Sequence, residues 1–379
     1  ERAKVIREWE EFLNTRDYKH QLTSRYIYEH LFLAHLYLKD HPRSFYRIIR
    51  SKTPCQDPQM ISARTPNDDP GTNVFYYCII KFNATIVNKN HLPYEISIHK
   101  LDWIKGLFIA ASWDVTSGSF PPYKKIIPKG KINLQDISKG SLFPKENEKD
   151  IEQNKFASNP FQVFKNIPQE SRYRFLLEDA YYHIMTFMKG TSCNGTLSVN
   201  AVRDHFFVLF MDPKADMKIN TNAVLDFHEF PSRYGKEVEA KKITSYFKQA
   251  ETRRLARHRR NENLLKEFPA GLPMEVIWNG DRADGEESLQ ANKKILTTNN
   301  KNAILTIFRH NDSASVTRGP LGDLTKTAFV MDYSTFERMA YDLVINFDAF
   351  GSFGHMILTR TYMNLIRSDA EDNYLSFFP

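Results

Sequence analysis

The sequence predicts an α+β fold with mixed helices and small antiparallel sheets, not a doubly wound parallel fold. Helical and strand-like stretches follow one another without strict alternation, and no internal repeat is visible. The chain has 379 residues, of which 41% are hydrophobic and 13% aromatic. A chain of this size and composition can bury a large core, in one domain or in two.

The central element of the prediction is the stretch 24–37, which is apolar on every side at helical spacing. A helix of that kind is typically buried. Asp17 can cap its start, and Pro42 forbids its continuation past about Asp40. We therefore expect one long buried helix in this part of the chain.

Four polar residues lie on this predicted helix and need partners from elsewhere in the chain if the helix is buried. Arg25 and Glu29 are four positions apart and can form an ion pair. His30 and His35 are five positions apart, about 140° around the axis, which argues against one metal ion bound by both. The pattern indicates either buried structural pairs or one wall of a site.

The other elements of the first part follow from apolar spacing and turn residues. We expect helices over residues 1–14 and 99–111, and strands over residues 44–51, 73–82 and 84–88.

The second part begins with a strong helix over residues 166–190, followed by a segment of ambiguous periodicity at 198–210. A long charged helix is expected over residues 235–268. Further strands are expected at 303–310, 314–317 and 327–331, and closing helices at 335–347 and 355–367.

The composition divides the chain into three parts. Residues 1–116 form a predicted helix-and-sheet part and residues 161–379 a C-terminal α+β part. Residues 117–160 are rich in Pro, Gly, Lys, Asn and Ser, which indicates a long loop or a domain junction between them. The two flanking parts can also form one continuous domain.

The formal net charge of +7 favours anionic partners. The predicted charged helix is crowded with arginines in its later half: Arg253, Arg254, Arg257, Arg259 and Arg260. Such a run is most often a solvated face, but a basic amphipathic helix is also the usual form of a contact with a membrane surface. No nucleic-acid-binding motif accompanies the charge, so nucleic acid is not an expected partner.

The short motifs of known enzyme classes do not identify a reaction for this sequence. The sequence has no P-loop, no GxGxxG after a predicted strand, no HExxH and no GxSxG. Its three cysteines, Cys55, Cys78 and Cys193, form no CxxC pattern, so neither a disulfide framework nor a metal site is expected. No apolar run approaches the length of a membrane span.

Longer blocks carry a family resemblance. The stretch 25–37, the stretch 171–180 with 185–187, and the stretch 305–310 resemble, in this order, segments of the bacterial fatty acid cis/trans isomerases. The Pro93-Tyr94 dipeptide and closing residues such as Glu337 and Arg338 extend the resemblance over nearly the whole chain.

The resemblance implies a periplasmic c-type haem protein that isomerises unsaturated fatty acyl chains and so alters membrane fluidity under stress. The expected partners are unsaturated fatty acids or phospholipid acyl chains at a peripheral membrane surface. The expected cofactor is haem c, although the family's Cys-x-x-Cys-His attachment motif is absent here. We therefore expect this chain to be a central portion of a longer protein.

An isolated C=C bond has no acidic proton, so general acid and base groups cannot lower its rotation barrier, whereas haem iron could transiently reduce the bond order. On this basis the expected catalytic haem neighbours are His30, His35, His310 and His355. An apolar slot is expected from Tyr28, Phe32, Phe175 and Tyr182. The carboxylate is expected to be held by Arg25, Arg309 or Arg360. Two other functions remain open, a haem-free lipid-binding protein and a periplasmic electron-transfer cytochrome.

Overall fold

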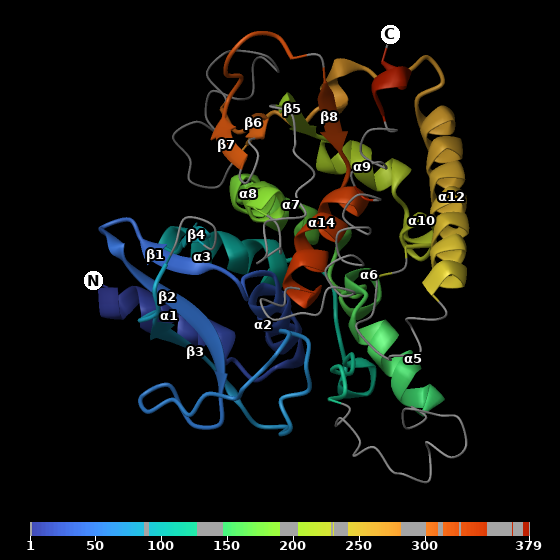
Figure 1. Ribbon diagram of the computed structural model, residues 1–379. Coiled ribbons are helices and arrows are strands. Elements are labelled where there is room, and N and C mark those ends of the chain that lie inside the picture. Colours follow the sequence, from blue (N-terminus) through green and yellow to red (C-terminus); the bar gives the residue numbers. More distant parts are fainter. Residues whose placement is uncertain are drawn as a thin grey trace.

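The α+β prediction is confirmed by a computed structural model, which combines two small sheets with surrounding helices (Figure 1). The structure describes residues 2–86, 91–126, 147–189, 204–228, 230, 242–281, 301–309, 314–325, 327–346, 366 and 374–378.

Each sheet has four strands, and the two sheets share one strand order. The first runs β3-β2-β1-β4 and the second β7-β6-β5-β8. The strands are β1 (His35–Leu38), β2 (His41–Ser51), β3 (Tyr76–Lys81), β4 (Pro93–Glu95), β5 (Asp204–Phe210), β6 (Ile304–Arg309), β7 (Ala314–Arg318) and β8 (Ala328–Met331).

The sheets are mixed, which corrects the expectation of purely antiparallel sheets. In each sheet the first three strands in sequence pair antiparallel, and the fourth returns on the far side of the first strand and runs parallel to it. The parallel pairs are β1 with β4 and β5 with β8. In each sheet a longer connection leads from the third strand to the fourth and brings the fourth beside the first, in the same direction. Local sequence patterns carry no signal for this pairing.

The helices cover and connect the sheets. The α-helices are α1 (Arg2–Leu13), α2 (Tyr18–His30), α3 (Ile98–Ile104), α5 (Glu148–Ala157), α6 (Pro160–Val163), α7 (Gln169–Glu178), α8 (Ala180–Lys189), α9 (Pro213–Ile219), α10 (Asn222–Leu225), α12 (Lys242–Glu267) and α14 (Tyr333–Asn346). A π-helical turn, η2 (Lys105–Ile109), continues α3, and short 3-10 turns are η3 (Ser117–Ser119), η5 (Met274–Val276) and η6 (Tyr374–Phe377).

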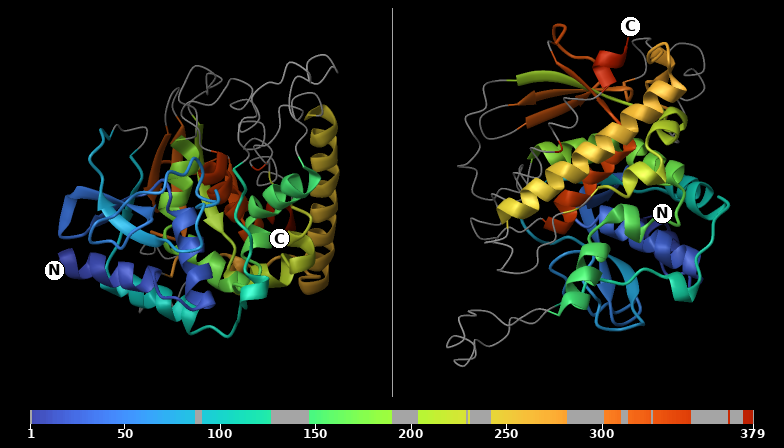
Figure 2. Two further views of the ribbon diagram at one scale, coloured as in Figure 1. Left: turned by 90° about the horizontal axis from the view of Figure 1, so that it is seen from below. Right: turned by 90° about the vertical axis from the view of Figure 1, so that its right-hand side faces the viewer.

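One continuous hydrophobic core joins the two sheets. It contains buried residues of α2, of both sheets and of α14, and α14 packs against α2, α7 and α8. A smaller cluster lies under α12, which runs along one side of the molecule (Figure 2). Among the described helices, none combines the length and the apolar character needed to cross a membrane.

The central helix is shorter than its sequence pattern predicts. Asp17 caps it as expected, with its side chain accepting a hydrogen bond from the backbone N–H of His20. The helix ends at His30 instead of near Asp40, and residues 35–38 form β1, because they pair with both β2 and β4. Pairing with two strands overrides the helical pattern of a short apolar run.

Two other expectations about helices and strands are corrected. The predicted helix over 166–190 is two helices that meet at Asp179, and residues 84–86 are not a strand. The described part of the predicted loop or domain junction at 117–160 contains α5. A disulfide joins Cys55 to Cys78, against the expectation of no disulfide framework. Three predicted helices and three predicted strands are confirmed, and their described ends differ from the predicted ends by at most seven residues. The helices are those at 1–14, 99–111 and 235–268, and the strands are those at 303–310, 314–317 and 327–331. The predicted helix over 355–367 lies almost entirely outside the described residues.

Candidate functional site

The most polar part of the core lies where α2 crosses α14. Arg25 of α2 is completely buried, and its Nε donates to Glu29 Oε1 over 2.8 Å. Its other guanidinium nitrogens donate to the carbonyl oxygens of Pro121 and Pro122, and the group stacks over the ring of Tyr123 at 4.0 Å. Three of the five N–H donors of Arg25 are therefore used within the protein.

His30 forms the second half of this cluster. Its Nδ1 lies 2.8 Å from the carbonyl oxygen of Tyr26, and its Nε2 lies 2.8 Å from Glu337 Oε1 on α14. A carbonyl oxygen can only accept, so Nδ1 carries a proton and one further proton lies between Nε2 and the carboxyl group. The hydroxyl of Tyr26 donates to Glu337 Oε2 over 3.2 Å.

The tyrosines of the cluster act as hydrogen-bond donors. Burial, together with the negative charge of Glu337, raises the pKa of Tyr26 well above its usual value. Burial and the charge of Glu29 do the same to the pKa of Tyr341, whose hydroxyl donates to Glu29 Oε2. Both phenols therefore stay protonated and serve as hydrogen-bond donors to the two carboxyl groups.

Arg172 of α7 stands out beside this cluster. Only 1% of the residue is exposed, and its Nε and Nη1 atoms have no hydrogen-bond partner among the described residues. The guanidinium lies 5.3 Å from the ring centre of Tyr333, and burial raises the pKa of this tyrosine well above its usual value. A buried cation with unused donors is costly, and it is therefore a candidate for binding an anion.

His183 of α8 is a third unusual group in the same region. Burial lowers the pKa of His183 to about 3, so the imidazole is neutral at physiological pH. Its ring packs edge-on against Phe336 at 5.8 Å, and its Nε2 has no hydrogen-bond partner within the described ranges.

The aromatic residues expected to form one slot lie in different parts of the core. Phe175 packs 5.4 Å from Tyr26, beside the polar cluster. Tyr28 and Phe32 pack against each other on the side of the first sheet, where Tyr28 also contacts Tyr77 of β3. Tyr182 lies against Tyr94.

The remaining expected site residues do not join the cluster in the described structure. His35 lies on β1, and its Nδ1 accepts the backbone N–H of Leu92. Arg309 ends β6, opposite Asp204 in the strand register. The histidine candidates His310 and His355 and the arginine candidate Arg360 lie outside the described residues.

The five arginines of α12 do not share one environment. Arg254 is exposed and pairs with Glu251, and Arg259 is exposed with its guanidinium over Phe227. Arg253 and Arg257 are half-buried. Arg260 is 6% exposed and faces the core, where it stacks over Tyr374 and lies 3.9 Å from Asp332.

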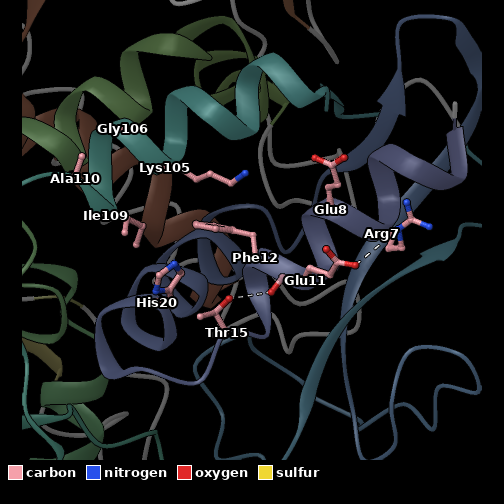
Figure 3. Close-up of a pocket in the computed structure, with 10 residues that line it drawn as sticks. All are labelled: Arg7, Glu8, Glu11, Phe12, Thr15, His20, Lys105, Gly106, Ile109 and Ala110. Carbon is pink, nitrogen blue, oxygen red and sulfur yellow. Dashed lines mark hydrogen bonds and ion pairs between the residues drawn. The ribbon is translucent and has the colours of Figure 1, made fainter.

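A surface groove of about 920 Å³ lies between α1 and the end of α3 with η2 (Figure 3). Phe12 and Ile109 provide apolar surface, and the lining carries charges of both signs, with Arg7 paired to Glu11 and with Glu8 and Lys105 beside them. π-Helical turns such as η2 occur frequently at functional sites. The groove can therefore accept an apolar chain.

The sequence has no Cys-x-x-Cys-His segment to attach haem c. Of the two histidines beside the cluster, His183 has an Nε2 without a partner among the described residues, whereas His30 has no ring nitrogen to offer. Both ring nitrogens of His30 are hydrogen-bonded, which leaves neither for iron. Within the described ranges, Glu10, Cys55 and Cys78 are the group of three side chains with metal-ligand atoms close together, and the two sulfurs are bonded to each other. No catalytic step is therefore derived through haem.

Sequence analysis missed Tyr26, Arg172, Tyr333 and Tyr341 as members of the cluster. A signal was present for Arg172, because it is a charge within an apolar helical stretch of a block that carries the family resemblance. Glu337 has the same signal and appeared in the resemblance, but without a role.

The family model described as fatty acid cis/trans isomerase matches residues 1–130 and 147–379. No curated protein and no solved structure matches the chain significantly.

Proposed function

The chain belongs to the fatty acid cis/trans isomerase family, and from this premise we propose that it converts cis double bonds of unsaturated fatty acyl chains to trans. The observation that carries the proposal is the extent of the family match, which covers both sheets and the helices between them. A straighter trans chain packs more tightly than a cis chain, so the product would lower membrane fluidity under stress.

We assign the carboxylate-binding role to Arg172 instead of Arg25. Arg25 is engaged by Glu29 and two carbonyl oxygens, whereas Arg172 keeps two buried donors without partners among the described residues. Arginine binds carboxylates through its N–H donors. Nε and Nη1 lie on different edges of the guanidinium group, so each can offer the carboxylate one hydrogen bond. Aromatic rings of the adjoining core, Phe175 among them, supply apolar surface for the acyl chain.

The residues of the cluster bind and orient, and they can hold a proton at His30 or Glu337. They do not by themselves weaken an isolated C=C bond, which has no proton for a base to remove. Haem dependence is therefore tested separately, by a visible absorption spectrum and an intact mass of the natively purified protein. A Soret band with a haem-sized mass excess would support it, and a colourless active protein would contradict it.

We also propose an oxidising compartment, namely the periplasm. The disulfide between Cys55 and Cys78 supports this location, because disulfides persist outside the reducing cytoplasm. Unsaturated acyl chains of the adjoining membranes are then within reach of the protein.

The direct test incubates the purified protein with palmitoleic acid and, separately, with vesicles of a palmitoleoyl phospholipid. Gas chromatography of the methyl esters measures trans product. We expect trans product from the free acid, and a variant with Arg172→Met should lose it. Product from the phospholipid alone, unchanged by this substitution, would overturn the role of Arg172.

A second candidate function is haem-free lipid binding, which the groove between α1 and η2 favours. Binding of palmitoleic acid without any trans product would support this alternative. The variant Lys105→Glu, which places a negative charge at the groove, should then weaken binding, whereas Arg172→Met should leave it unchanged.

A further inference from the structure

Arg50 is a second buried arginine with unused donors. It lies on β2 in the first sheet and is 1% exposed. Its Nη1 donates to the carbonyl oxygen of Asp68 over 2.7 Å, which fixes the guanidinium group. Its Nε and Nη2 have no hydrogen-bond partner of regular geometry among the described residues. These two nitrogens share one edge of the group, so their N–H bonds are parallel, as the two oxygens of a carboxylate require.

Aromatic rings enclose this guanidinium group. The ring centres of Tyr28, Phe75 and Tyr123 lie 5.5, 5.9 and 5.7 Å from its central carbon. Such contacts offset part of the cost of burying the cation, but they satisfy neither of the two free N–H groups. Tyr28 is buried, whereas Phe75 and Tyr123 are half-buried, with their ring centres 6.3 Å apart. A small solute would therefore reach Arg50 past Phe75 or Tyr123.

The tyrosines around Arg50 do not supply a negative charge. Burial raises the pKa of Tyr28 to about 12, although the neighbouring charge of Arg50 acts in the opposite direction. Burial also raises the pKa of Tyr77, the neighbour of Tyr28 on β3, well above its usual value. The pKa of Tyr123 is raised for the same reason. All three phenols are therefore neutral at physiological pH.

The buried carboxyl groups of this region already have cations. Glu29 pairs with Arg25 over 2.8 Å, and Asp68 pairs with Lys124 over 3.0 Å. All four of these side chains are buried. The region thus holds three buried cations and two buried carboxylates, and the charge of Arg50 is the one left over. Because an uncompensated charge is costly in a protein interior, one further anion is expected beside Arg50.

We propose that Arg50 binds a small monocarboxylate, of the size of acetate, through the parallel donors Nε and Nη2. One negative charge balances the charge left over, whereas a dianion such as sulfate would exceed it. The bound acid is short because aromatic rings enclose the guanidinium group. Arg50 lies in the first sheet and Arg172 on α7, and the proposal does not depend on the proposed function.

The test is differential scanning calorimetry in sodium acetate, with sodium chloride of equal concentration as the reference. Saturating acetate should raise the Tm of the unsubstituted protein by about 2 °C or more relative to chloride, because it binds the folded state. Arg50→Met should abolish this shift. The matched control is Arg47→Met, because Arg47 lies three positions earlier on β2, on the opposite face of the strand, and is half-buried. The control should keep the shift, and so should Arg172→Met.

A second measurement uses the unsubstituted protein and so does not depend on the folding of Arg50→Met. Isotope-filtered NMR with ¹³C-labelled acetate should show nuclear Overhauser effects between the acetate methyl group and aromatic ring protons. Substituting Phe75→Leu should remove part of them, since the ring of Phe75 lies beside Arg50. Formate should displace the labelled acetate, whereas sulfate at equal ionic strength should not.

Three results would overturn the proposal. The first is an equal Tm in acetate and chloride together with no methyl-to-ring effects. The second is a shift in acetate that persists in Arg50→Met or disappears in Arg172→Met, because the acid would then bind elsewhere. The third is displacement of acetate by sulfate, which would indicate a site for anions in general. Neither readout requires turnover, so a failure here leaves the proposed isomerase activity standing.

Discussion

His30 Nε2 lies 2.8 Å from Glu337 Oε1, although the two residues are 307 positions apart in the sequence. The contact joins α2, near the start of the chain, to α14, after the second sheet, and both side chains are completely buried. Tyr26 adds a second hydrogen bond to the same carboxyl group. The two parts of the molecule are thus joined by a polar contact inside a core that is otherwise largely apolar.

Removing the Glu337 carboxyl group should destabilise the protein strongly. Glu337→Ala leaves His30 and Tyr26 buried without their acceptor, and breaking such a buried network costs roughly 3–5 kcal/mol. Urea denaturation followed by circular dichroism measures the change in the free energy of unfolding. The control Glu251→Ala removes the exposed partner of Arg254 and should leave the denaturation midpoint unchanged. A loss below about 1 kcal/mol for Glu337→Ala would show that the contact contributes little.

Local pattern was sufficient for elements whose partners lie nearby in the sequence. The amphipathic spacing of α1 and the apolar runs of β6 and β7 around a short turn predicted their type and approximate bounds. The same reasoning failed for β1. Its four residues continue the apolar spacing of α2, and what makes them a strand is pairing with β2 and β4, which no local signal reveals.

The candidate site was predictable only in part. Arg25, Glu29 and His30 could be singled out, because polar side chains on an apolar helix need partners. The sequence could not reveal their partners on α14 or the unpartnered donors of Arg172, because tertiary packing brings together residues that are far apart in the sequence.

Replacing Arg172 should raise the stability of the protein without ligand. Arg172→Met removes a buried cation whose Nε and Nη1 have no partner among the described residues, and it keeps an apolar side chain of similar length. Differential scanning calorimetry should show a higher Tm. Added palmitoleic acid should raise the Tm of the unsubstituted protein but not that of the variant.

The matched control for that experiment is Arg25→Met. It leaves Glu29 buried without its cation, so it should lower the Tm. If Arg172→Met lowers the Tm as much as Arg25→Met does, and palmitoleic acid still raises the Tm of the Arg172→Met variant, then Arg172 is structural and holds no carboxylate.

The stabilising contribution of the Asp216 carboxyl group should be lost as the pH rises from about 4 to about 8. Burial, together with the neighbouring charge of Asp332, raises the pKa of Asp216 to about 8. The unfolded chain releases this proton near pH 4, so the folded state binds the extra proton throughout this window. The stabilising contribution is complete below about pH 4 and is lost as the pH approaches 8.

Asp216→Asn should remove this contribution, so that stability falls less with rising pH than in the unsubstituted protein, because the amide does not titrate. Thermal unfolding at half-unit pH steps gives the slope, and Asp226→Asn is the control, since Asp226 is exposed on the neighbouring turn after α10. An unchanged slope in Asp216→Asn would mean that another group carries the dependence.

Opening the disulfide should destabilise the first sheet. The bond closes a loop between Cys55 and Cys78, which are 23 positions apart, and cross-linking a loop of this size contributes about 3 kcal/mol. The double substitution Cys55→Ser and Cys78→Ser should lower the free energy of unfolding by about that amount. Alkylation of the denatured protein followed by intact mass should modify one cysteine without reductant and three after reduction. Three modified cysteines before reduction would contradict both the bond and the oxidising compartment proposed from it.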